Sequence, residues 1–376
     1  MKHLENLTIH QFRGIRDLHL PNLGQINLIV GVNNSNKTSV LEAISSYCAP
    51  LDLREWLRIA RQREGDIVLR SPTIDALLWL FPQDGNATKD SLYKGEILIS
   101  GTGNFPVTQL RAVCQKIEGI QVSGNIRSHQ KINDSVAESE DDLFEIQQGL
   151  NLEINVSTKR IDLFSKEEIV ESFQLWENER VMPGYKHESL TLPVATVTPF
   201  SHRTEVLQAR LLTEARMANF KSEVLKLLQH IDSGIIDIEI LTPQRRPIIY
   251  VQHKQAGLAP LSTFGDGIRR LLFIALKLAK VKGGILLIDE LEVSIHTEAL
   301  QRSFNWLIEW CILMDVQLFA TTHSLEAIDA LLDATNSKSG LVAYRLEPKQ
   351  SQTNAVRLDR DLLYILREEL GQEVRK

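Results

Sequence analysis

The sequence predicts an α/β fold, in which a mixed sheet is packed against helices. The apolar run at residues 26–30 leads through a polar loop into a helical pattern that begins at Lys37. A second apolar run at residues 284–288 predicts a buried strand, and two carboxylates follow it. Between residues 261 and 332 the pattern alternates helix, buried strand, helix, strand and helix. Such alternation is typical of parallel strands joined by helices.

The composition supports a folded chain with a large core. Of the 376 residues, 43% are hydrophobic and 24% are charged, which excludes a disordered chain, a collagen and a coiled-coil rod. The formal net charge is -6, so the chain as a whole has no basic excess that would bind nucleic acid phosphates. Any contact with DNA therefore requires a local patch or a partner.

The three cysteines lie far apart in the sequence, at Cys48, Cys114 and Cys311. Their odd number and wide spacing argue against a disulfide framework and against a clustered zinc site. The first residues lack the apolar run of a signal peptide, and charged residues interrupt the most apolar later stretches, at 271–278 and 306–320. We therefore expect a cytoplasmic protein with no membrane contact.

The first part of the chain predicts mainly strands. Short strand-like pieces separated by turns fill residues 7–20. Residues 49–82 are predicted as helix and loop, and they end in an apolar run, 76–81, that we expect in the core. Alternating segments between residues 96 and 173 predict antiparallel strands, and an acidic stretch at 135–142 interrupts them as an expected solvated loop.

An amphipathic helical pattern covers residues 204–230, and charged residues fill its polar face. The helix is too short to form a long coiled-coil arm. Strands are expected again at 235–241 and 248–252. The apolar positions of the helical pattern are Leu207, Leu211, Met217, Phe220, Val224 and Leu228.

A loop rich in asparagine and serine joins the first buried strand to the following helix, which is the context of a phosphate-binding P-loop. Backbone N–H groups at a helix N-terminus converge on phosphate oxygens. Lys37 then reaches the β- and γ-phosphates, and the Thr38 hydroxyl ligates Mg²⁺. The residues predicted to bind the nucleotide in this loop are Gly31, Asn33, Asn34, Ser35, Asn36, Lys37, Thr38 and Ser39.

Asn36 departs from the usual P-loop, which has a glycine before the lysine. Asparagine is among the non-glycine residues that best tolerate a positive φ. We therefore expect the loop to form. The properties that the change from glycine can reduce are nucleotide affinity and turnover. Taken alone, the motif is also compatible with an ordinary strand-to-helix turn that binds no phosphate.

Two adjacent carboxylates, Asp289 and Glu290, end the second apolar run. This Walker B pattern places Asp289 in the Mg²⁺ shell and lets Glu290 polarise the attacking water. A core strand that ends by accident in acidic residues is the alternative, and it is favoured only if no P-loop is present. We therefore predict Thr38 and Asp289 as metal ligands, and Lys37 and Glu290 as catalytic residues.

Two further segments follow in the order of a known arrangement. The glycine-bearing turn at 262–267 leads into a helix, whose N-terminus can bind a phosphate presented from outside. His323 stands at the end of a predicted strand, where it can sense a γ-phosphate as a catalytic residue, although a lone histidine is usually structural. Four motifs in one order, each on its expected element, are hard to obtain by accident.

This order of motifs resembles the ATP-binding-cassette (ABC) ATPase superfamily. Residues 12–15 (Phe-Arg-Gly-Ile) and 41–44 (Leu-Glu-Ala-Ile) resemble more narrowly its DNA-related branch. That branch includes RecF, the heads of structural-maintenance-of-chromosomes (SMC) proteins and the overcoming-lysogenisation-defect (OLD) ATPases. The stretch 289–292, with His296 shortly after it, is most similar to stand-alone OLD-like "AAA family" ATPases without a Toprim domain.

The resemblance is strong over residues 4–44 and 260–332 and weak between them. It implies an α/β ABC-type P-loop ATPase head with a mixed central sheet, an antiparallel β subdomain and a short helical insertion. It also implies three regions: the N-terminal part of the head with the P-loop (1–48), an inserted helical and β region (49–259), and the C-terminal part with signature, Walker B and His switch (260–376).

In that family two subunits sandwich two ATP molecules, so the resemblance implies a homodimer. Ser262, Thr263 and Gly265 would face the γ-phosphate bound by the partner's P-loop, and Arg13 would approach the nucleotide. The signature departs from the usual Leu-Ser-Gly-Gly-Gln, which leaves open whether the hydroxyl of Ser262 or of Thr263 makes the contact. For the Q-loop glutamine, Gln83 is the only suggestion.

The resemblance implies a Mg²⁺-dependent ATP hydrolase that dimerises around ATP. It would be a switch or motor subunit in a DNA-related or anti-phage defence system, with a separate effector such as a nuclease, because the stretch after His323 is too short for a Toprim domain. The long separation of Lys37 from Ser262 disfavours a transporter subunit. Two alternatives stay open: a RecF-like DNA repair ATPase that binds DNA, and a catalytically silent nucleotide-binding module that signals by occupancy.

Residues 195–203 end a strand-like piece and resemble a recurrent feature of the stand-alone group. His202 and Arg203 are candidates for contact with DNA, a partner or the nucleotide. A capped helix start with a solvated arginine is favoured, because Ser201 and Thr204 can both cap a helix.

Overall fold

The structure is a computed structural model of the 376-residue chain. The acidic stretch 135–142 and Leu207 lie outside the residues that it describes. Within the described part, no helix is both long enough and apolar enough to cross a membrane. The described residues are 2–63, 73–83, 93–122, 144–159, 168–177, 190–205, 208–336, 339–349 and 352–375.

A six-stranded mixed sheet forms the centre of the molecule. Its order is β15-β14-β3-β13-β12-β8, and every neighbouring pair is parallel except β14 with β15. The strand that leads into the P-loop, β3, is thus separated by β13 from β12, the strand that ends in the two carboxylates. The strands are β3 Ile26–Gly31, β8 Val194–Val197, β12 Ile285–Ile288, β13 Gln317–Thr321, β14 Leu341–Lys349 and β15 Gln352–Asp359.

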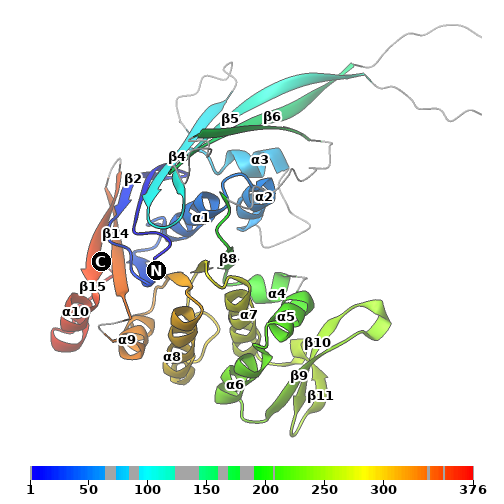
Figure 1. Ribbon diagram of the computed structural model, residues 1–376, viewed down its shortest axis with the longest axis vertical. Coiled ribbons are helices and arrows are strands. Elements are labelled where there is room, and N and C mark those ends of the chain that lie inside the picture. Colours follow the sequence, from blue (N-terminus) through cyan, green and yellow to red (C-terminus); the bar gives the residue numbers. More distant parts are fainter. Residues whose placement is uncertain are drawn as a thin grey trace, which may run out of the picture.

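A second six-stranded sheet is antiparallel throughout, in the order β2-β1-β4-β5-β6-β7. The long β5–β6 ribbon projects to the upper right in Figure 1, away from the central sheet. The middle region, 49–259, supplies strands to both sheets, and its limits stay a prediction. The strands are β1 Asn6–Phe12, β2 Ile15–Leu20, β4 Lys94–Thr102, β5 Val107–Val122, β6 Phe144–Thr158 and β7 Glu168–Trp176.

Helices cover both faces of the central sheet (Figure 1). On the side of the antiparallel sheet these are α1 Lys37–Cys48, α2 Leu53–Arg61 and α3 Thr73–Leu78. A small antiparallel sheet, β11-β10-β9, extends from the other side, with β9 Ile235–Leu241, β10 Ile248–His253 and β11 Gly257–Pro260. The other helices are α4 Ser201–Thr204, α5 Gln208–Met217, α6 Lys221–Ile231, α7 Asp266–Lys280, α8 Thr297–Leu313, α9 Leu325–Ala334 and α10 Arg360–Tyr364.

The central strands separate two hydrophobic cores, because their side chains alternate between the two faces. On β12, Leu286 and Ile288 belong to the core formed with α5 to α9. Ile285 and Leu287 point the other way, into the core shared with α1 to α3 and the antiparallel sheet. Burial on both faces explains why this strand is a continuous apolar run in the sequence.

Two expectations about apolar segments were wrong. The single helix predicted at 204–230 is replaced by two helices, α5 and α6, and only its first residue, Thr204, belongs to α4. Asn219, with a positive φ of 56°, separates α5 from α6. Met217, which was expected on the apolar face, is 81% exposed, because it ends α5. In the apolar run 76–81, Trp79 is 62% exposed and borders a cavity, whereas its neighbours are buried as expected.

Candidate functional site

The P-loop follows β3 and passes through two left-handed asparagines before α1 begins. Asn34 has a φ of 63°, and Asn36, which directly precedes α1, has a φ of 66°. Asn36 thus adopts the conformation that glycine usually supplies, as its tolerance of positive φ predicts. A Cβ atom at Gly14 would lie 3.3 Å from Asn36 Oδ1, so the glycine between β1 and β2 leaves room for this amide.

Lys37 folds back over the loop that precedes it. Its Nζ donates to the carbonyl oxygens of Gly31 at 2.9 Å and Val32 at 2.8 Å, and to Ser35 Oγ at 3.4 Å. The side chain is 6% exposed, and burial lowers the pKa of its ammonium against the opposing effect of the nearby carboxylates. These partners are neutral oxygens, which phosphate oxygens can replace with a stronger, charge-assisted bond.

Thr38 and Asp289 meet between the P-loop and the end of β12. The Thr38 hydroxyl donates to Asp289 Oδ2 at 3.0 Å, and the hydroxyl of Thr321 at the end of β13 donates to Asp289 Oδ1 at 2.7 Å. Within the described residues no group of three or more histidines, cysteines and carboxylates could hold a metal by itself. One carboxylate and one hydroxyl nevertheless fit Mg²⁺, which usually takes few protein ligands and completes its shell with phosphates and water.

Glu290 sits at a strained point directly after the metal-ligand candidate. Its φ is 50°, and its backbone N–H donates to Thr321 Oγ1 at 2.8 Å. Burial raises the pKa of its carboxyl, and the neighbouring charges of Asp289 and Glu292 raise it further. A carboxylate with a raised pKa is better suited to accept a proton near neutral pH than an ordinary glutamate.

Arg270 joins the helix that follows the signature segment to the two carboxylate residues. It is fully buried on α7, and its guanidinium donates to the carbonyl oxygens of Asp289 at 3.0 Å and Glu290 at 2.5 Å. A third bond, of 2.9 Å, goes to the carbonyl oxygen of Thr198 after β8. Burial lowers the pKa of Arg270 to about 10, so it stays charged at neutral pH.

His323 lies two residues after the end of β13, close to the same cluster. Its backbone N–H donates to Glu292 Oε1 at 2.9 Å. Burial lowers the pKa of the imidazole, and the positive charge of Lys37 lowers it further. Thr321 on β13 pairs with Ile29 on β3, so the segment that carries His323 leaves the sheet beside the strand that leads into the P-loop. A neutral histidine there can donate a hydrogen bond to a phosphate.

A cleft of about 300 Å³ opens where these elements meet. Its wall contains Thr38, Asp289 and Glu290, as the sequence motifs predict. Sequence reasoning missed the rest of the wall, and within residues 195–203 it pointed to His202 and Arg203, not to the residues that line the cleft. Because Val197 on β8 pairs in parallel register with Ile288 on β12, the two strand ends lie side by side. The other lining residues are Gln62, Arg63, Thr198, Pro199, Phe200 and Thr204.

Arg13 lies on the other side of the P-loop, in the turn between β1 and β2. Its Nε lies 2.7 Å from Glu42 Oε2, and the Glu42 side chain is inaccessible to solvent. Arg63, which sequence reasoning missed, donates to the same carboxylate at 2.9 and 2.8 Å and to Ser39 Oγ at 2.8 Å. Two arginines around one buried carboxylate leave positive charge beside α1, which favours an anionic ligand.

A second cavity, of about 330 Å³, lies beside this pair. Trp79 forms part of its wall together with three arginines, and none of the described residues that line it is a carboxylate. Gln83 also lies here and not in the cleft with Asp289; its amide donates to the carbonyl oxygens of Leu78 and Phe81. Gln62 is the glutamine that reaches the cleft. The remaining lining residues are Arg13, Gly14, Arg16, Asn36, Ser39, Arg63 and Phe81.

The signature segment does not line the cleft formed by its own chain. Ser262, Thr263 and Gly265 are exposed in the segment just before α7, and Ser262 borders a different cavity. Thr263 Oγ1 donates to the carbonyl oxygen of Pro260 at 2.8 Å. A Cβ atom at Gly265 would meet no atom of the described residues within 4 Å, so this surface is open among them.

The segment after β8 does not form the expected capped helix start. Ser201 Oγ accepts from the backbone N–H of Thr198 at 2.8 Å, and no side chain caps the four-residue α4. His202 is 1% exposed, and burial lowers its pKa to about 4 with help from nearby arginines. Arg203 pairs with Asp266, the first residue of α7, and so is not simply solvated.

The P-loop, the carboxylates after β12 and the mixed sheet together define a P-loop ATPase domain. The family model described as "AAA domain, putative AbiEii toxin, Type IV TA system" matches residues 123–329, more than half of the chain. The chain therefore belongs to this family of AAA-type P-loop ATPase domains. The matched region contains Asp289, Glu290 and His323, and it begins after the P-loop.

Solved structures share the fold at low sequence identity. An SMC head bound to the C-winged helix domain of ScpA is 10% identical with a TM-score of 0.50, over 95% of this chain and 98% of that chain. The SMC head domain from Thermotoga maritima is 11% identical with a TM-score of 0.41, over 95% and 99% of the two chains. The first likeness confirms the predicted fold of an ATPase head, and the fold alone.

Two curated relatives are uncharacterized proteins of Methanocaldococcus jannaschii. MJECL10 is 54% identical over 44 residues, which are 12% of this chain and 20% of that protein. MJECL11 is 42% identical over 77 residues, which are 20% of this chain and 67% of that protein. The chain thus spans a fifth of the first relative and two thirds of the second.

Proposed function

We propose that the chain is a Mg²⁺-dependent ATP hydrolase, and that the cleft beside Asp289 is its active site. The observation that carries the proposal is the meeting of Thr38 with Asp289, at 3.0 Å, beside the buried ammonium of Lys37. P-loop enzymes hold a metal-bound triphosphate with a lysine and a hydroxyl at the N-terminus of one helix and a carboxylate at the end of a neighbouring strand.

Each predicted site residue then has a defined task. Lys37 and the backbone N–H groups before α1 bind the phosphate oxygens. Thr38 and Asp289 would hold Mg²⁺, which, when bound, neutralises charge on the β- and γ-phosphate oxygens. Glu290 orients the attacking water and accepts its proton, and the raised pKa of its carboxyl supports that task. His323 contacts the γ-phosphate from the end of β13.

The second cavity provides room for the base and ribose of the nucleotide. It shares Asn36 and Ser39 with the P-loop, so a ligand whose phosphates lie on the loop can extend into it. Trp79 offers an exposed indole face, on which a purine can stack. Arg13 borders the same space, in agreement with its expected approach to the nucleotide.

The exposed signature segment supports a dimer around ATP. Hydrolysis in this proposal needs a second phosphate-binding surface, and Ser262, Thr263 and Gly265 present one just before α7, outside the cleft of their own chain. Two copies related by a twofold axis would each offer this surface to the other's nucleotide. The homodimer is therefore part of the proposal.

For the biological role we propose a switch subunit of a defence system. The description of the matched family names an AbiEii toxin and a type IV toxin–antitoxin system, which supports defence over housekeeping transport. A separate effector, such as a nuclease, and an OLD-like relationship belong to the same proposal. A RecF-like repair ATPase is the alternative, and it requires ATP-dependent, salt-sensitive DNA binding despite the net charge of -6.

The test is phosphate release by the full chain with Mg²⁺ and ATP. We expect turnover in the wild type and a loss of about 100-fold or more in Glu290→Gln, with ATP affinity retained. Glu298→Gln on α8, an exposed glutamate outside the cleft, is the matched control and should hydrolyse normally. A wild type that binds ATP without turnover would instead establish the silent signalling module.

Light scattering tests the dimer with the same variant. Glu290→Gln should double its mass when Mg²⁺ and ATP are added, because a site that binds but does not hydrolyse holds the closed state. A mass that never changes would refute closure on nucleotide.

A further inference from the structure

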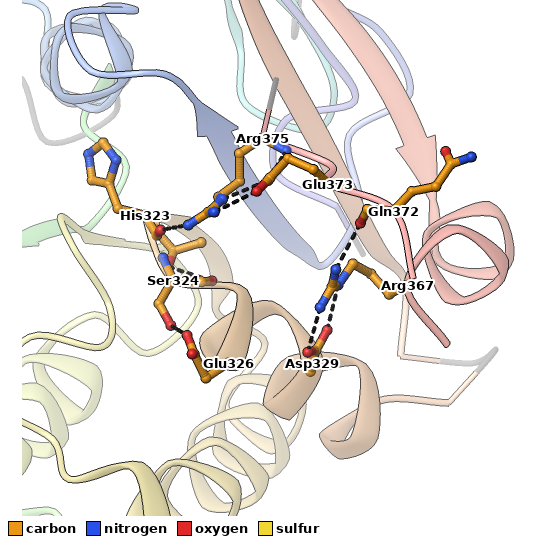
Figure 2. Close-up of polar contacts among 9 residues, drawn as sticks. His323, Ser324, Glu326, Asp329, Arg367, Gln372, Glu373 and Arg375 are labelled. Carbon is orange, nitrogen blue, oxygen red and sulfur yellow. Dashed lines mark hydrogen bonds and ion pairs between the residues drawn. The ribbon is translucent and has the colours of Figure 1, made fainter. Parts of the chain in front are cut away.

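The segment between Arg367 and Arg375 returns to the strand end that carries His323, although more than forty residues separate the two in the sequence. Figure 2 shows Arg375 pointing at the His323 main chain and Arg367 pointing at α9. The Arg375 guanidinium donates through Nη1 to the carbonyl oxygen of His323. This contact joins a distant part of the chain to a residue of the proposed active site.

The main chain of His323 is held on both sides. Its N–H donates to Glu292 Oε1 at 2.9 Å, and Glu292 comes from the loop that follows the two active-site carboxylates. Its carbonyl oxygen accepts from Arg375. The backbone N–H and carbonyl oxygen of His323 are thus both fixed, so that only the side-chain torsions can move the imidazole. A fixed backbone of this kind is what a preorganised site requires.

The guanidinium of Arg375 is itself oriented. Arg375 Nε donates to Glu373 Oε1 at 2.7 Å and Nη2 donates to Glu373 Oε2 at 2.6 Å, which leaves Nη1 for His323. A two-bond contact of this kind fixes the plane of the guanidinium. Val374, between the two, is 1% exposed and belongs to the core under α9, so the backbone is anchored at this point.

The same segment also holds the helix that begins next to His323. Ser324 caps α9, and its Oγ accepts from the N–H of Ala327 at 3.1 Å. On the second turn of α9, Asp329 accepts two bonds of 2.8 Å from Arg367. The strand end and the helix are therefore fixed to one segment at two points, as Figure 2 shows.

We propose that Arg375, oriented by Glu373, is a positioning residue that holds the His323 main chain, and through it the imidazole, for the contact with the γ-phosphate. The proposal rests on the function proposed above, in which His323 contacts the γ-phosphate. Arg375 touches no nucleotide in this proposal; it acts through His323. Because its side chain is about a third exposed, its removal leaves no large cavity, and the fold should tolerate the change.

The first measurement compares steady-state ATP hydrolysis with nucleotide binding in the full chain. Arg375→Ala should lower kcat about tenfold and leave the Kd for Mg²⁺ and ATP within about twofold, because P-loop contacts are unchanged. Arg375→Lys should recover part of the loss, since the lysine ammonium can still donate to the His323 carbonyl oxygen. Arg210→Ala, which breaks the exposed Arg210–Glu214 pair on α5, is the matched control and should keep the wild-type kcat.

The second measurement does not depend on turnover. The imidazole resonances of the chain's ten histidines are recorded by NMR, and that of His323 is assigned from its absence in His323→Ala. Arg375→Ala should shift the His323 resonance and leave that of the exposed His296 in place. The proposal requires both results: an unchanged kcat or an unmoved His323 resonance overturns it.

Failure of this inference is distinct from failure of the proposed function. If the wild type hydrolyses ATP and Arg375→Ala does so equally well, only the positioning role is lost. If the wild type has no turnover at all, the hydrolase proposal fails first, and the role of Arg375 in hydrolysis fails with it even if the resonance of His323 moves.

Discussion

The Thr38 hydroxyl donates a hydrogen bond to Asp289 Oδ2 at 3.0 Å, although 251 residues separate the two in the sequence. Parallel pairing explains the meeting. β13 pairs with β3 on one side and with β12 on the other, so the ends of all three strands reach the same edge. Polar residues that follow parallel strands gather at such an edge, which is where open α/β sheets bind ligands.

The first prediction concerns this hydroxyl. Thr38→Val keeps the shape of the side chain and removes the oxygen, so it should weaken ATP binding about tenfold or more in Mg²⁺ and change it little in excess chelator. Isothermal titration with and without the metal measures the difference. Thr297→Val, at the exposed start of α8, is the control. An equal loss of ATP affinity in excess chelator would contradict the role of Thr38 as a metal ligand.

Asn36 provides a second prediction, about backbone strain. Asn36 has a φ of 66°, which glycine adopts without strain. Asn36→Gly should therefore keep or improve ATP affinity. Asn36→Ala should destabilise the fold by about 1 kcal/mol, because alanine tolerates this region less well. Chemical unfolding and ATP titration of both variants check the result, and equal stability of the two would contradict the explanation.

The third prediction concerns Arg270. Its removal leaves buried carbonyl oxygens of Thr198, Asp289 and Glu290 without a donor. Arg270→Met should therefore lower the free energy of unfolding by about 3 kcal/mol. Urea unfolding measures this. Arg210→Met at the exposed pair on α5 should have an effect below about 0.5 kcal/mol. Similar losses in both variants would argue against the buried network.

Trp79 carries the fourth prediction. Trp79→Ala should weaken ATP binding about tenfold, since stacking on one base contributes about 1–3 kcal/mol. Binding of inorganic tripolyphosphate, which has the phosphates without a base, should not change. An equal fall in the affinities for ATP and for tripolyphosphate would show that the indole supports the P-loop and does not stack on the base.

The fifth prediction is a pH dependence. Burial and the charges of Asp289 and Glu292 raise the pKa of Glu290. The carboxylate form is the one that accepts a proton, so kcat should fall as the pH decreases through a pKa above the usual value of about 4.3. The acidic limb of a profile of kcat against pH measures this pKa. A limb with a midpoint at or below the usual glutamate pKa would contradict the prediction.

The sequence motifs predicted those parts of the site that depend on adjacent residues. The P-loop turn, the left-handed Asn36 and the strand before Asp289 each follow from fewer than ten consecutive residues, whose local geometry the sequence largely determines. The alternation from 261 to 332 likewise predicted α7, β12, α8, β13 and α9 in order.

The remaining wall of the cleft could not be predicted in this way. Thr198 reaches it because β8 pairs with β12, and Gln62 because α2 packs beside α1, and no local pattern records either contact. Trp79 belongs to an apolar run, and periodicity does not show that a neighbouring cavity leaves its indole uncovered. Tertiary packing decides these positions.

In the proposed dimer, the exposed Ser262 would make the rate of hydrolysis depend on the amount of the chain. The active site would draw on two copies, so hydrolysis in dilute solution would rise with the square of the protein concentration. Halving the number of copies would then cut the output to a quarter. The abundance of the chain would itself act as a signal, before any ligand or partner intervenes.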